Sequence, residues 1–392
     1  MRRRSPTDYA LLGVILALVL GGLVMVFSAS AIVAEKRFGG PWFFFKRQLL
    51  WAALGLGAMG FLSRLDYNRL KEWVWPVFFV TAVTLAAVLA APAREHVHRW
   101  LPLGPFTLQP SEFAKYTVVL FLAYYLDRRH SKTGTPLGGL VVPGVVVSVL
   151  LLLIAAEPDL GTPVLIFLVT VLMLWLGGGK LSHLLAAGAL ALPAVALEVL
   201  RHPYRLKRIM HYLSSLTGGS EASYQLEQAV LAVGSGGWLG KGVGASQLKL
   251  GYLPTPHTDF IFPVVCEELG LLGALLLLGL FATLLVRGLR VARSAPNLFG
   301  SLLAAGITLT VCLQAFINAG MSIGLLPTKG MPMPFISYGG SSLLVTLAAA
   351  GVLLNISKQS SMHARYTAHG APALAKEGPW PGATGLLGGR RP

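Results

Sequence analysis

An aspartate at the entrance to an apolar stretch is the first candidate for chemistry in this sequence. Asp259 follows Pro254 and Pro256 and comes just before the apolar run that starts at Phe260. The prolines fix an extended approach, so we expect Asp259 at or near the N-cap of a helix. A carboxylate there serves either as a plain cap or as a base that accepts a proton from a substrate. Spacing alone leaves both roles open.

A second cluster stands at the start of another apolar stretch. Glu112 and Lys115 follow Gln109 and Pro110, and proline suits the first turn of a helix. The two charged residues are three positions apart, so they can pair on one helix face. The cluster is therefore either a neutralised scaffold or a point of contact with a substrate.

Two carboxylates form a third cluster. Glu157 and Asp159 flank Pro158, which disfavours helical geometry at the residue before it. Asp159 is well placed to cap the helix that follows. Two carboxylates can also offer oxygen ligands to a divalent cation, but two are too few to specify one. The residues of any metal site are left unassigned.

Two further segments are dense in glycine or proline. Residues 234–244 hold six glycines, with Lys241 and Lys249 nearby. Backbone N–H groups beside lysines can cradle phosphate oxygens, although a flexible lid has the same composition. Residues 324–342 combine many glycines and prolines, which predicts a structured re-entrant loop. Lys329 in this loop would add positive charge to a cavity on the non-cytoplasmic side of the membrane.

The amino-acid composition indicates that these residues are positioned by transmembrane helices. Of the 392 residues, 54% are hydrophobic and only 12% are charged, and the mean hydropathy is +0.67. One soluble core cannot bury so much apolar surface, and apolar runs of membrane-spanning length recur along the chain. We therefore predict an all-α integral membrane protein of about ten transmembrane helices. The predicted spans are 10–33, 48–63, 74–92, 110–126, 138–156, 160–177, 181–200, 260–286, 299–324 and 339–356.

The net charge of +16 does not indicate a nucleic-acid partner. Basic residues of membrane proteins gather on cytoplasmic loops, and no basic stretch here is interleaved with aromatic residues as single-strand binding requires. The two cysteines, Cys266 and Cys312, both lie in apolar runs, so neither a disulfide framework nor a cysteine metal site is predicted.

The distribution of basic residues predicts the topology. Most of them fall on the side of the N-terminus, which places both termini in the cytoplasm. We expect a cytoplasmic N-terminus (1–9), a transmembrane domain (10–356) and a disordered cytoplasmic tail (357–392). A large extracytoplasmic loop, 201–258, separates helices 7 and 8. Within it, residues 202–216 have the pattern of a basic amphipathic helix on a membrane surface.

Five separated motifs of this chain together resemble one family. They are Gln109 to Lys115, Glu157 to Thr162, Tyr224 to Gly244, Leu253 to Gly270 and Gly324 to Ser342. Their order and topology are similar to those of the SEDS family, which includes FtsW, RodA and SpoVE. The resemblance covers residues 10 to 357. Val26 to Ser30 and the Thr328-Lys329-Gly330 variant of the last motif are closer to FtsW than to RodA.

The resemblance implies a peptidoglycan glycosyltransferase that polymerises lipid II in cell division. The growing glycan chain would leave its undecaprenyl diphosphate for an acceptor sugar hydroxyl, with Asp259 as the general base. A divalent cation, Mg²⁺ or Mn²⁺, would help positive side chains to stabilise the diphosphate, and no organic cofactor is expected. The expected substrate-binding residues are Arg47, Glu112, Lys115, Asp159, Gln225, Lys329, Ser337 and Gly339.

The resemblance also implies partners and a location. The partners would be lipid II, a class B penicillin-binding protein with transpeptidase activity and other divisome membrane proteins. The location would be the bacterial cytoplasmic membrane at the division septum. Two alternatives are a lipid II flippase and a non-catalytic divisome scaffold. A flippase needs a charged route across the whole membrane, whereas the ionisable residues of this chain gather near one side.

Overall fold

The computed structural model describes residues 8–90, 99–103, 106–157, 159, 161–201, 203–216, 224–250, 256–327 and 330–368. These residues are mostly helical, which confirms the predicted all-α class. The α-helices are α1 (Tyr9–Phe38), α2 (Phe43–Leu62), α3 (Leu70–Ala90), α4 (Pro110–Arg128), α5 (Val142–Ala156), α6 (Gly161–Leu176), α7 (Leu181–Arg201), α8 (Pro203–Leu216), α9 (Tyr224–Ser235), α10 (Ile261–Ser294), α11 (Leu298–Ser322) and α12 (Gly340–Ala368).

Short elements join these helices. They are the strands β1 (Leu101–Leu103) and β2 (Phe106–Leu108), the 3-10 turns η1 (Tyr67–Arg69), η2 (His130–Lys132) and η4 (Leu248–Leu250), and the π-helical turn η3 (Leu137–Val141). β1 and β2 pair as an antiparallel hairpin, which was not predicted. Ser341 at the start of α12 anchors the hairpin, since its Oγ accepts from the Gln109 N–H at 3.2 Å and donates to the Thr107 carbonyl at 3.1 Å.

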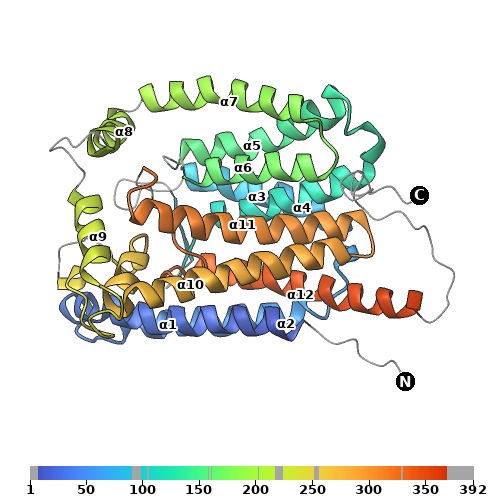
Figure 1. The fold of residues 1–392 in the computed structure, drawn as a ribbon. Helices are drawn as coiled ribbons and strands as arrows, with labels where there is room; N and C mark the ends of the chain where they lie inside the picture. The colour runs from blue at the N-terminus through green and yellow to red at the C-terminus, as the bar shows by residue number, and fades with distance from the viewer. Residues whose placement is uncertain are drawn as a thin grey trace, which may run out of the picture.

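α11 and α12 form the centre of the helix bundle. The apolar stretches of these two helices are 78% and 83% buried, respectively. α12 packs on α2, α11 packs on α10 and α4, and α1 packs on α2 and α10. α7 lies at the periphery, with 13% of its stretch buried (Figure 1). A polar side chain on α11 or α12 is therefore surrounded by protein rather than by lipid.

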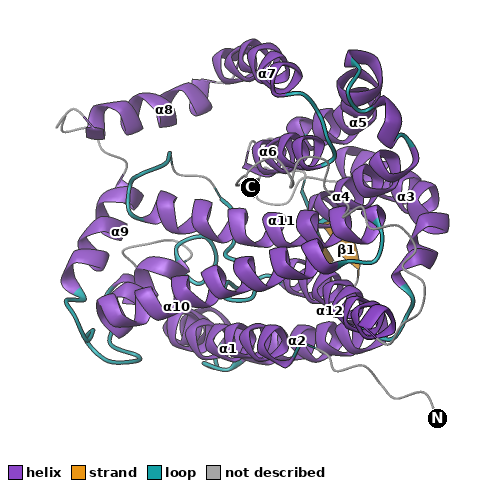
Figure 2. Ribbon diagram, turned by 45° about the vertical axis from the view of Figure 1, so that its right-hand side comes forward, coloured by secondary structure: helices purple, strands orange, loops and turns teal. Residues whose placement is uncertain are grey.

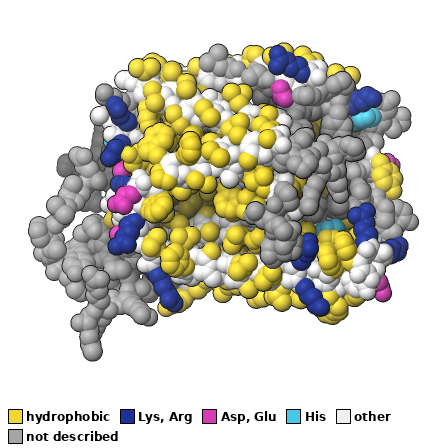
Figure 3. Space-filling view, turned by 180° about the vertical axis from the view of Figure 1, so that it is seen from behind, with side chains coloured by type: hydrophobic (Ala, Val, Ile, Leu, Met, Phe, Trp, Pro, Cys, Tyr) yellow, Lys and Arg dark blue, Asp and Glu magenta, His cyan; other side chains and the backbone are white. Residues whose placement is uncertain are grey.

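One face of the bundle is largely apolar across its middle. Figure 3 shows hydrophobic side chains across the middle of one face, with most charged side chains toward the ends. Among the described residues, seven helices are long and apolar enough to cross a membrane, and α6 is apolar but shorter. The other two predicted spans coincide with α2 and α4, which contain Lys46 and Lys115, respectively. The chain is a multi-pass membrane protein.

The two ends of the bundle differ in what they hold. The start of α1 and the end of α12 lie at one end, here the terminal end (Figure 1). α8, α9 and the start of α10 lie at the opposite end, here the α9 end. α8 runs across the direction of α7 (Figures 1 and 2) and covers all but one residue of the amphipathic helix predicted over 202–216. The segments expected to do chemistry therefore gather at the α9 end.

The eighth predicted span is interrupted in the structure. α10 runs from Ile261 to Ser294, but Gly270 inside it has φ 67° and ψ −166°, which are not helical angles. A nine-residue head, Ile261–Leu269, therefore precedes the longer part of the helix. The apolar pattern continues through the break, so hydropathy alone could not reveal it.

The predicted disordered tail is helical in its first part. α12 continues beyond residue 356 to Ala368, and two polar side chains just after residue 356 bind it to the turn after α2. Lys358 Nζ donates to the Ser63 carbonyl at 3.1 Å, and Gln359 Nε2 donates to Asp66 Oδ1 at 3.0 Å. Residues 369–392 lie outside the described part of the chain.

Candidate active site

Asp259 lies in the turn that leads into α10, at the α9 end. The N-cap position is Phe260, so Asp259 is close to the helix start, as predicted. Asn318 of α11 donates from Nδ2 to the Asp259 carbonyl at 2.8 Å. A Cβ built on Gly330 would lie 2.9 Å from Asp259 Oδ2, so glycine allows the loop backbone to approach this carboxylate closely. The turn is thus held between α11 and the loop that follows it.

The loop 324–339 packs against the Asp259 turn. Ser337 Oγ donates to the Thr258 carbonyl at 2.6 Å, and the Tyr338 N–H donates to the His257 carbonyl at 2.9 Å. The loop also reaches α1, where a Cβ at Gly22 would overlap the carbonyl oxygen of Phe335. The described part of the loop is therefore an ordered segment among helices, as expected of a re-entrant loop.

Three buried amide side chains that the sequence analysis did not single out hold this loop. Asn318 donates to the Met331 carbonyl at 2.7 Å as well as to Asp259, and Gln314 Nε2 donates to the Pro332 carbonyl at 2.7 Å. Gln48 of α2 donates to the Ser337 carbonyl at 3.2 Å and accepts from the Gly339 N–H at 3.3 Å. Their position inside predicted membrane spans could have identified these amides as functional or structural residues, because a polar group without a partner is costly in a membrane.

Lys115 and Glu112 form the predicted pair, and both are buried. Lys115 Nζ lies 2.8 Å from Glu112 Oε2, and it also donates to Gln314 Oε1 at 2.6 Å. Gln314 in turn binds the Pro332 carbonyl of the loop. A chain of contacts therefore runs from α4 through α11 to the loop beside Asp259, and Lys115 is part of the loop's support.

Asp159 is a helix cap, as its spacing predicted. Its Oδ1 accepts from the backbone N–H groups of Gly161 at 2.8 Å and Thr162 at 3.3 Å, and its Oδ2 accepts from Thr162 Oγ1 at 2.8 Å. These bonds satisfy groups at the start of α6 that have no partner within the helix. The capping role is therefore confirmed, while contact of Asp159 with a substrate stays a prediction.

Glu157 contrasts with Asp159. It is fully buried, and neither carboxylate oxygen has a hydrogen-bond partner among the described residues. Burial, with a smaller contribution from Asp159, raises the pKa of Glu157 to about 8. Arg99 Nε donates to the Glu157 carbonyl at 3.0 Å rather than to the carboxylate. Glu157 is therefore protonated at neutral pH and cannot act there as a fixed negative charge.

Three of the other predicted substrate-binding residues lie around the same end. Arg47 stacks on Phe43 at 4.7 Å and hydrogen-bonds the Tyr338 side chain, which places it beside the loop. Gly339 is bound through its N–H to Gln48. Gln225 is in the first turn of α9, where the neighbouring Leu226 faces Gly324. Lys329 lies outside the described residues.

His257 is enclosed by aromatic rings. Its ring centroid lies 4.6 Å from that of Phe44 and 5.7 Å from that of Tyr338. Burial, with a smaller contribution from the nearby Arg37, lowers the pKa of His257 to about 4. The imidazole is therefore neutral at pH 7 and supplies no positive charge to a diphosphate.

The described residues do not form a ready-made metal site, since no three His, Cys, Asp or Glu side chains come together among them. Asp159 already accepts three hydrogen bonds, whereas the carboxylate oxygens of Glu157 have no hydrogen-bond partner among the described residues. Two carboxylates of which one is committed to a helix cap are too few to specify a cation.

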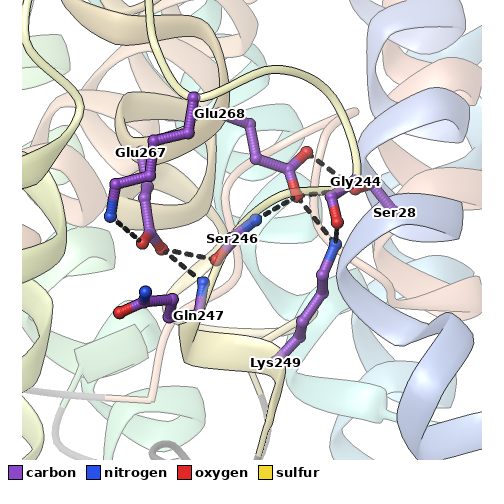
Figure 4. A network of polar contacts seen from close by, with 8 residues as sticks. Ser28, Gly244, Ser246, Gln247, Lys249, Glu267 and Glu268 are labelled. Atoms are coloured by element: carbon purple, nitrogen blue, oxygen red, sulfur yellow. Dashed lines mark hydrogen bonds and ion pairs between the residues drawn. The ribbon is translucent and has the colours of Figure 1, made fainter.

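The glycine-rich stretch has a different role from the phosphate cradle considered for it. We call residues 236–250 the clasp, because they wrap around the break in α10. Lys241 pairs with Glu267 at 2.8 Å, and Lys249 pairs with Glu268 at 3.2 Å (Figure 4). Both lysines are thus already paired with carboxylates. The backbone N–H groups of Lys241 and Gly242 likewise donate to carbonyls of the α10 head.

The fold and this arrangement can now be compared with known proteins. Residues 9–362 match the model of a family described as "Cell cycle protein", of the FtsW, RodA and SpoVE type. The chain belongs to this family. The resemblance drawn from the five motifs is therefore confirmed.

Individual relatives carry the activity in their names. The chain is 39% identical over 358 residues to the probable peptidoglycan glycosyltransferase FtsW of Trichlorobacter lovleyi, covering 91% of this chain and 94% of that protein. It is also 39% identical over 361 residues to the stage V sporulation protein E of Bacillus subtilis, covering 91% and 99%. The enzyme class implied by the sequence, peptidoglycan glycosyltransferase, is confirmed.

Solved structures agree with the fold. One similar chain belongs to a study of a peptidoglycan synthase complex that coordinates polymerization and crosslinking, with a TM-score of 0.74 and 27% identity, covering 90% of this chain and 98% of that one. The rod shape determining protein RodA of Thermus thermophilus gives a TM-score of 0.67 and 28% identity, covering 90% and 96%.

Proposed function

We propose that this chain polymerises lipid II into glycan strands, with Asp259 as the general base and undecaprenyl diphosphate as the leaving group. The observation that carries the proposal is the setting of Asp259. Its backbone carbonyl is held by Asn318, and its carboxylate faces the glycine backbone of Gly330. A base must be held at a fixed place to accept a proton from an acceptor hydroxyl, and such catalysis typically supplies about 10²- to 10⁴-fold.

Positive charge is the second requirement, because the leaving diphosphate gains negative charge as the bond breaks. Arg47 lies beside the loop, and Lys329 belongs to the same segment of the sequence. Lys115 is buried against Glu112, so its proposed contribution is to hold Gln314 and the loop in place. The proposed substrate contacts are otherwise Asp159, Gln225, Ser337 and Gly339.

A divalent cation is part of the proposal, held mainly by diphosphate oxygens and water. Mg²⁺ is usually bound in this way, with few protein ligands. Removing divalent ions with EDTA should lower the rate of strand formation by purified protein, and adding back Mg²⁺ or Mn²⁺ should restore it. An unchanged rate in EDTA would remove the cation from the proposal.

The proposed setting is the cytoplasmic membrane of a bacterium at the division septum, with both termini inside and the α9 end outside. The proposed partners are a class B penicillin-binding protein, which would crosslink the strands, and other divisome membrane proteins. The similar chain from a peptidoglycan synthase complex supports such a partner.

Replacing the proposed base tests the function. Purified Asp259→Asn protein, given lipid II together with the partner transpeptidase, should lose strand formation by at least about 10²-fold while keeping its fold and partner binding. Asp127→Asn is the matched control. Asp127 Oδ2 lies 2.7 Å from Lys71 Nζ, and this ion pair is not part of the Asp259 turn. Strand formation by Asp259→Asn at the wild-type rate would refute the assignment. Transport of lipid II across vesicles without strand formation by the wild type would favour the flippase.

A further inference from the structure

The break in α10 creates a second polar centre at the far end of the helix head that begins after the Asp259 turn. Gly270 has a positive φ, and a Cβ there would overlap the backbone of Gly240 and approach that of Trp238. The clasp passes through this space. The N–H groups of Leu271 and Leu272, which start the longer part of α10, donate to the carbonyls of Gly237 at 2.9 Å and Trp238 at 3.2 Å. The break in α10 and the clasp are therefore held together by backbone hydrogen bonds.

Two buried glutamates fill this centre, and their oxygens are surrounded by donors. Glu267 accepts from Lys241 Nζ at 2.8 Å, Ser246 Oγ at 2.6 Å and the Gln247 N–H at 3.1 Å. Figure 4 shows that Glu267 and Glu268 both face the clasp from the head of α10. Two carboxylates and two ammonium groups also balance in charge, which a buried cluster requires.

Glu268 extends the network to α1. Its carboxylate accepts from Ser28 Oγ of α1 at 2.8 and 2.6 Å and from the Ser246 N–H at 3.3 Å. It also pairs with Lys249, which donates to the Gly244 carbonyl as well (Figure 4). Side chains of Lys249 and Glu268 are 7% and 0% exposed, whereas Lys241 is 32% exposed. The Lys249–Glu268 pair is therefore the least solvated part of the network.

This pair anchors the head of α10, which begins two residues after the proposed base. Glu268 lies near the end of that head, Ile261–Leu269, and Asp259 lies in the turn just before it. The ion pair at 3.2 Å holds the head to the clasp, and Ser28 holds it to α1. Asn318 and Ser337 hold the turn before the head, through the carbonyls of Asp259 and Thr258. The turn and the head are thereby held at both ends.

We propose that Glu268 and Lys249, with Ser28, are positioning residues for the reaction: they set the place of Asp259 by locking the head of α10 to α1 and to the clasp. This inference rests on the proposed role of Asp259. Loss of the pair should move the carboxylate relative to the acceptor hydroxyl, and a displacement of 1 Å at a reacting centre can cost about 10²-fold in rate.

The test compares Lys249→Met and Lys249→Arg in the full-length protein bound to its partner transpeptidase, with lipid II as substrate. Lys249→Met should lower kcat by about 10- to 100-fold and change KM by less than about threefold. It should also move the acid limb of the pH–rate profile, because the surroundings of the base change. Lys249→Arg retains the charge and should recover most of the rate.

Two further variants keep the test decisive. Lys71→Met removes the lysine of an ion pair elsewhere and should leave kcat and the acid limb unchanged. Ser28→Ala removes the contact with Glu268 without changing charge, so a few-fold fall in kcat is expected even if Lys249→Met fails to fold. Wild-type kcat and pH profile in folded Lys249→Met, or in Ser28→Ala when Lys249→Met does not fold, would overturn the inference. If Asp259→Asn retained activity in the same assay, the proposed function itself would fail.

Discussion

The clasp and the loop 324–339 are both rich in glycine and both lie at the α9 end, yet they bind their neighbours in different ways. The clasp meets Glu267 and Glu268 with two lysines, two backbone N–H groups and the Ser246 hydroxyl. The loop is held through main-chain carbonyls by the neutral amides of Gln48, Gln314 and Asn318. The clasp thus pairs both of its lysines with carboxylates of α10, whereas the described part of the loop is anchored mainly by neutral amides.

The largest expected effect comes from breaking the clasp. Gly240 has φ 79°, and a Cβ there would overlap the Glu268 carbonyl. Gly240→Ala should therefore destabilise the protein by more than about 3 kcal/mol, through strain and overlap together. Thermal unfolding in detergent would measure the change. Gly234→Ala is the control, since a Cβ on Gly234 meets nothing within 4 Å and alanine favours a helix. Equal stability of both variants would contradict this account of the clasp.

A smaller effect on stability, but a clear one on activity, is expected from loosening the loop. Asn318→Ala removes the donor to the part-buried Asp259 carbonyl and to the buried Met331 carbonyl, and losing the donor to a buried acceptor costs free energy. We expect kcat for strand formation to fall by about 10- to 100-fold with little change in KM. Ser322→Ala is the control on the same helix, because Ser322 Oγ bonds only within α11. Wild-type kcat in Asn318→Ala would show that the loop does not depend on this amide.

A change in the pH dependence of stability, rather than in activity, is expected at Glu157, whose carboxylate oxygens have no hydrogen-bond partner among the described residues. Its pKa is about 8 in the folded chain, mainly because of burial, against an ordinary value of 4.5. The folded chain binds more protons than the unfolded chain between these values, so the stability due to this group is complete below pH 4.5 and is lost as the pH rises through 8. Glu157→Gln should remove this loss, and its unfolding midpoint should rise relative to wild type between pH 4.5 and 8. Parallel midpoints across that range would contradict the raised pKa.

The sequence predicted the parts of the fold that follow from hydropathy and local spacing. Every predicted span coincides with a helix, Asp159 caps α6, and Glu112 pairs with Lys115, because each depends on residues close in the chain. The clasp could not be predicted in this way. Ser28 and Glu268 are far apart in sequence, and the lysines beside the glycines were compatible with either a phosphate cradle or a flexible lid, whereas in the fold they pair with Glu267 and Glu268.

The interpretation of Asp259 as a catalytic base rests on family resemblance rather than on hydropathy or local spacing. Spacing alone left it as a helix cap or a base, and the resemblance of five motifs selected the base. The amides that hold its turn and the neighbouring loop were not predicted, because Asn318 and Gln314 carry no charge and lie inside an apolar span. Only the fold reveals that their partners are carbonyls of the loop and of Asp259 itself.

The close approach of Gly22 to Phe335 links the loop to the thickness of the bilayer. Roughly 24 Å of helix, at 1.5 Å a residue, separates Gly22 from the end of α1 at Phe38. The loop therefore meets α1 far from the C-terminal end of that helix, and glycine places no side chain between the two backbones. A transmembrane helix adjusts to thicker or thinner lipid by changing its tilt. Since α1 and the loop touch through their backbones, such a tilt moves the loop as well, and acyl-chain length becomes a variable in any measurement of this enzyme.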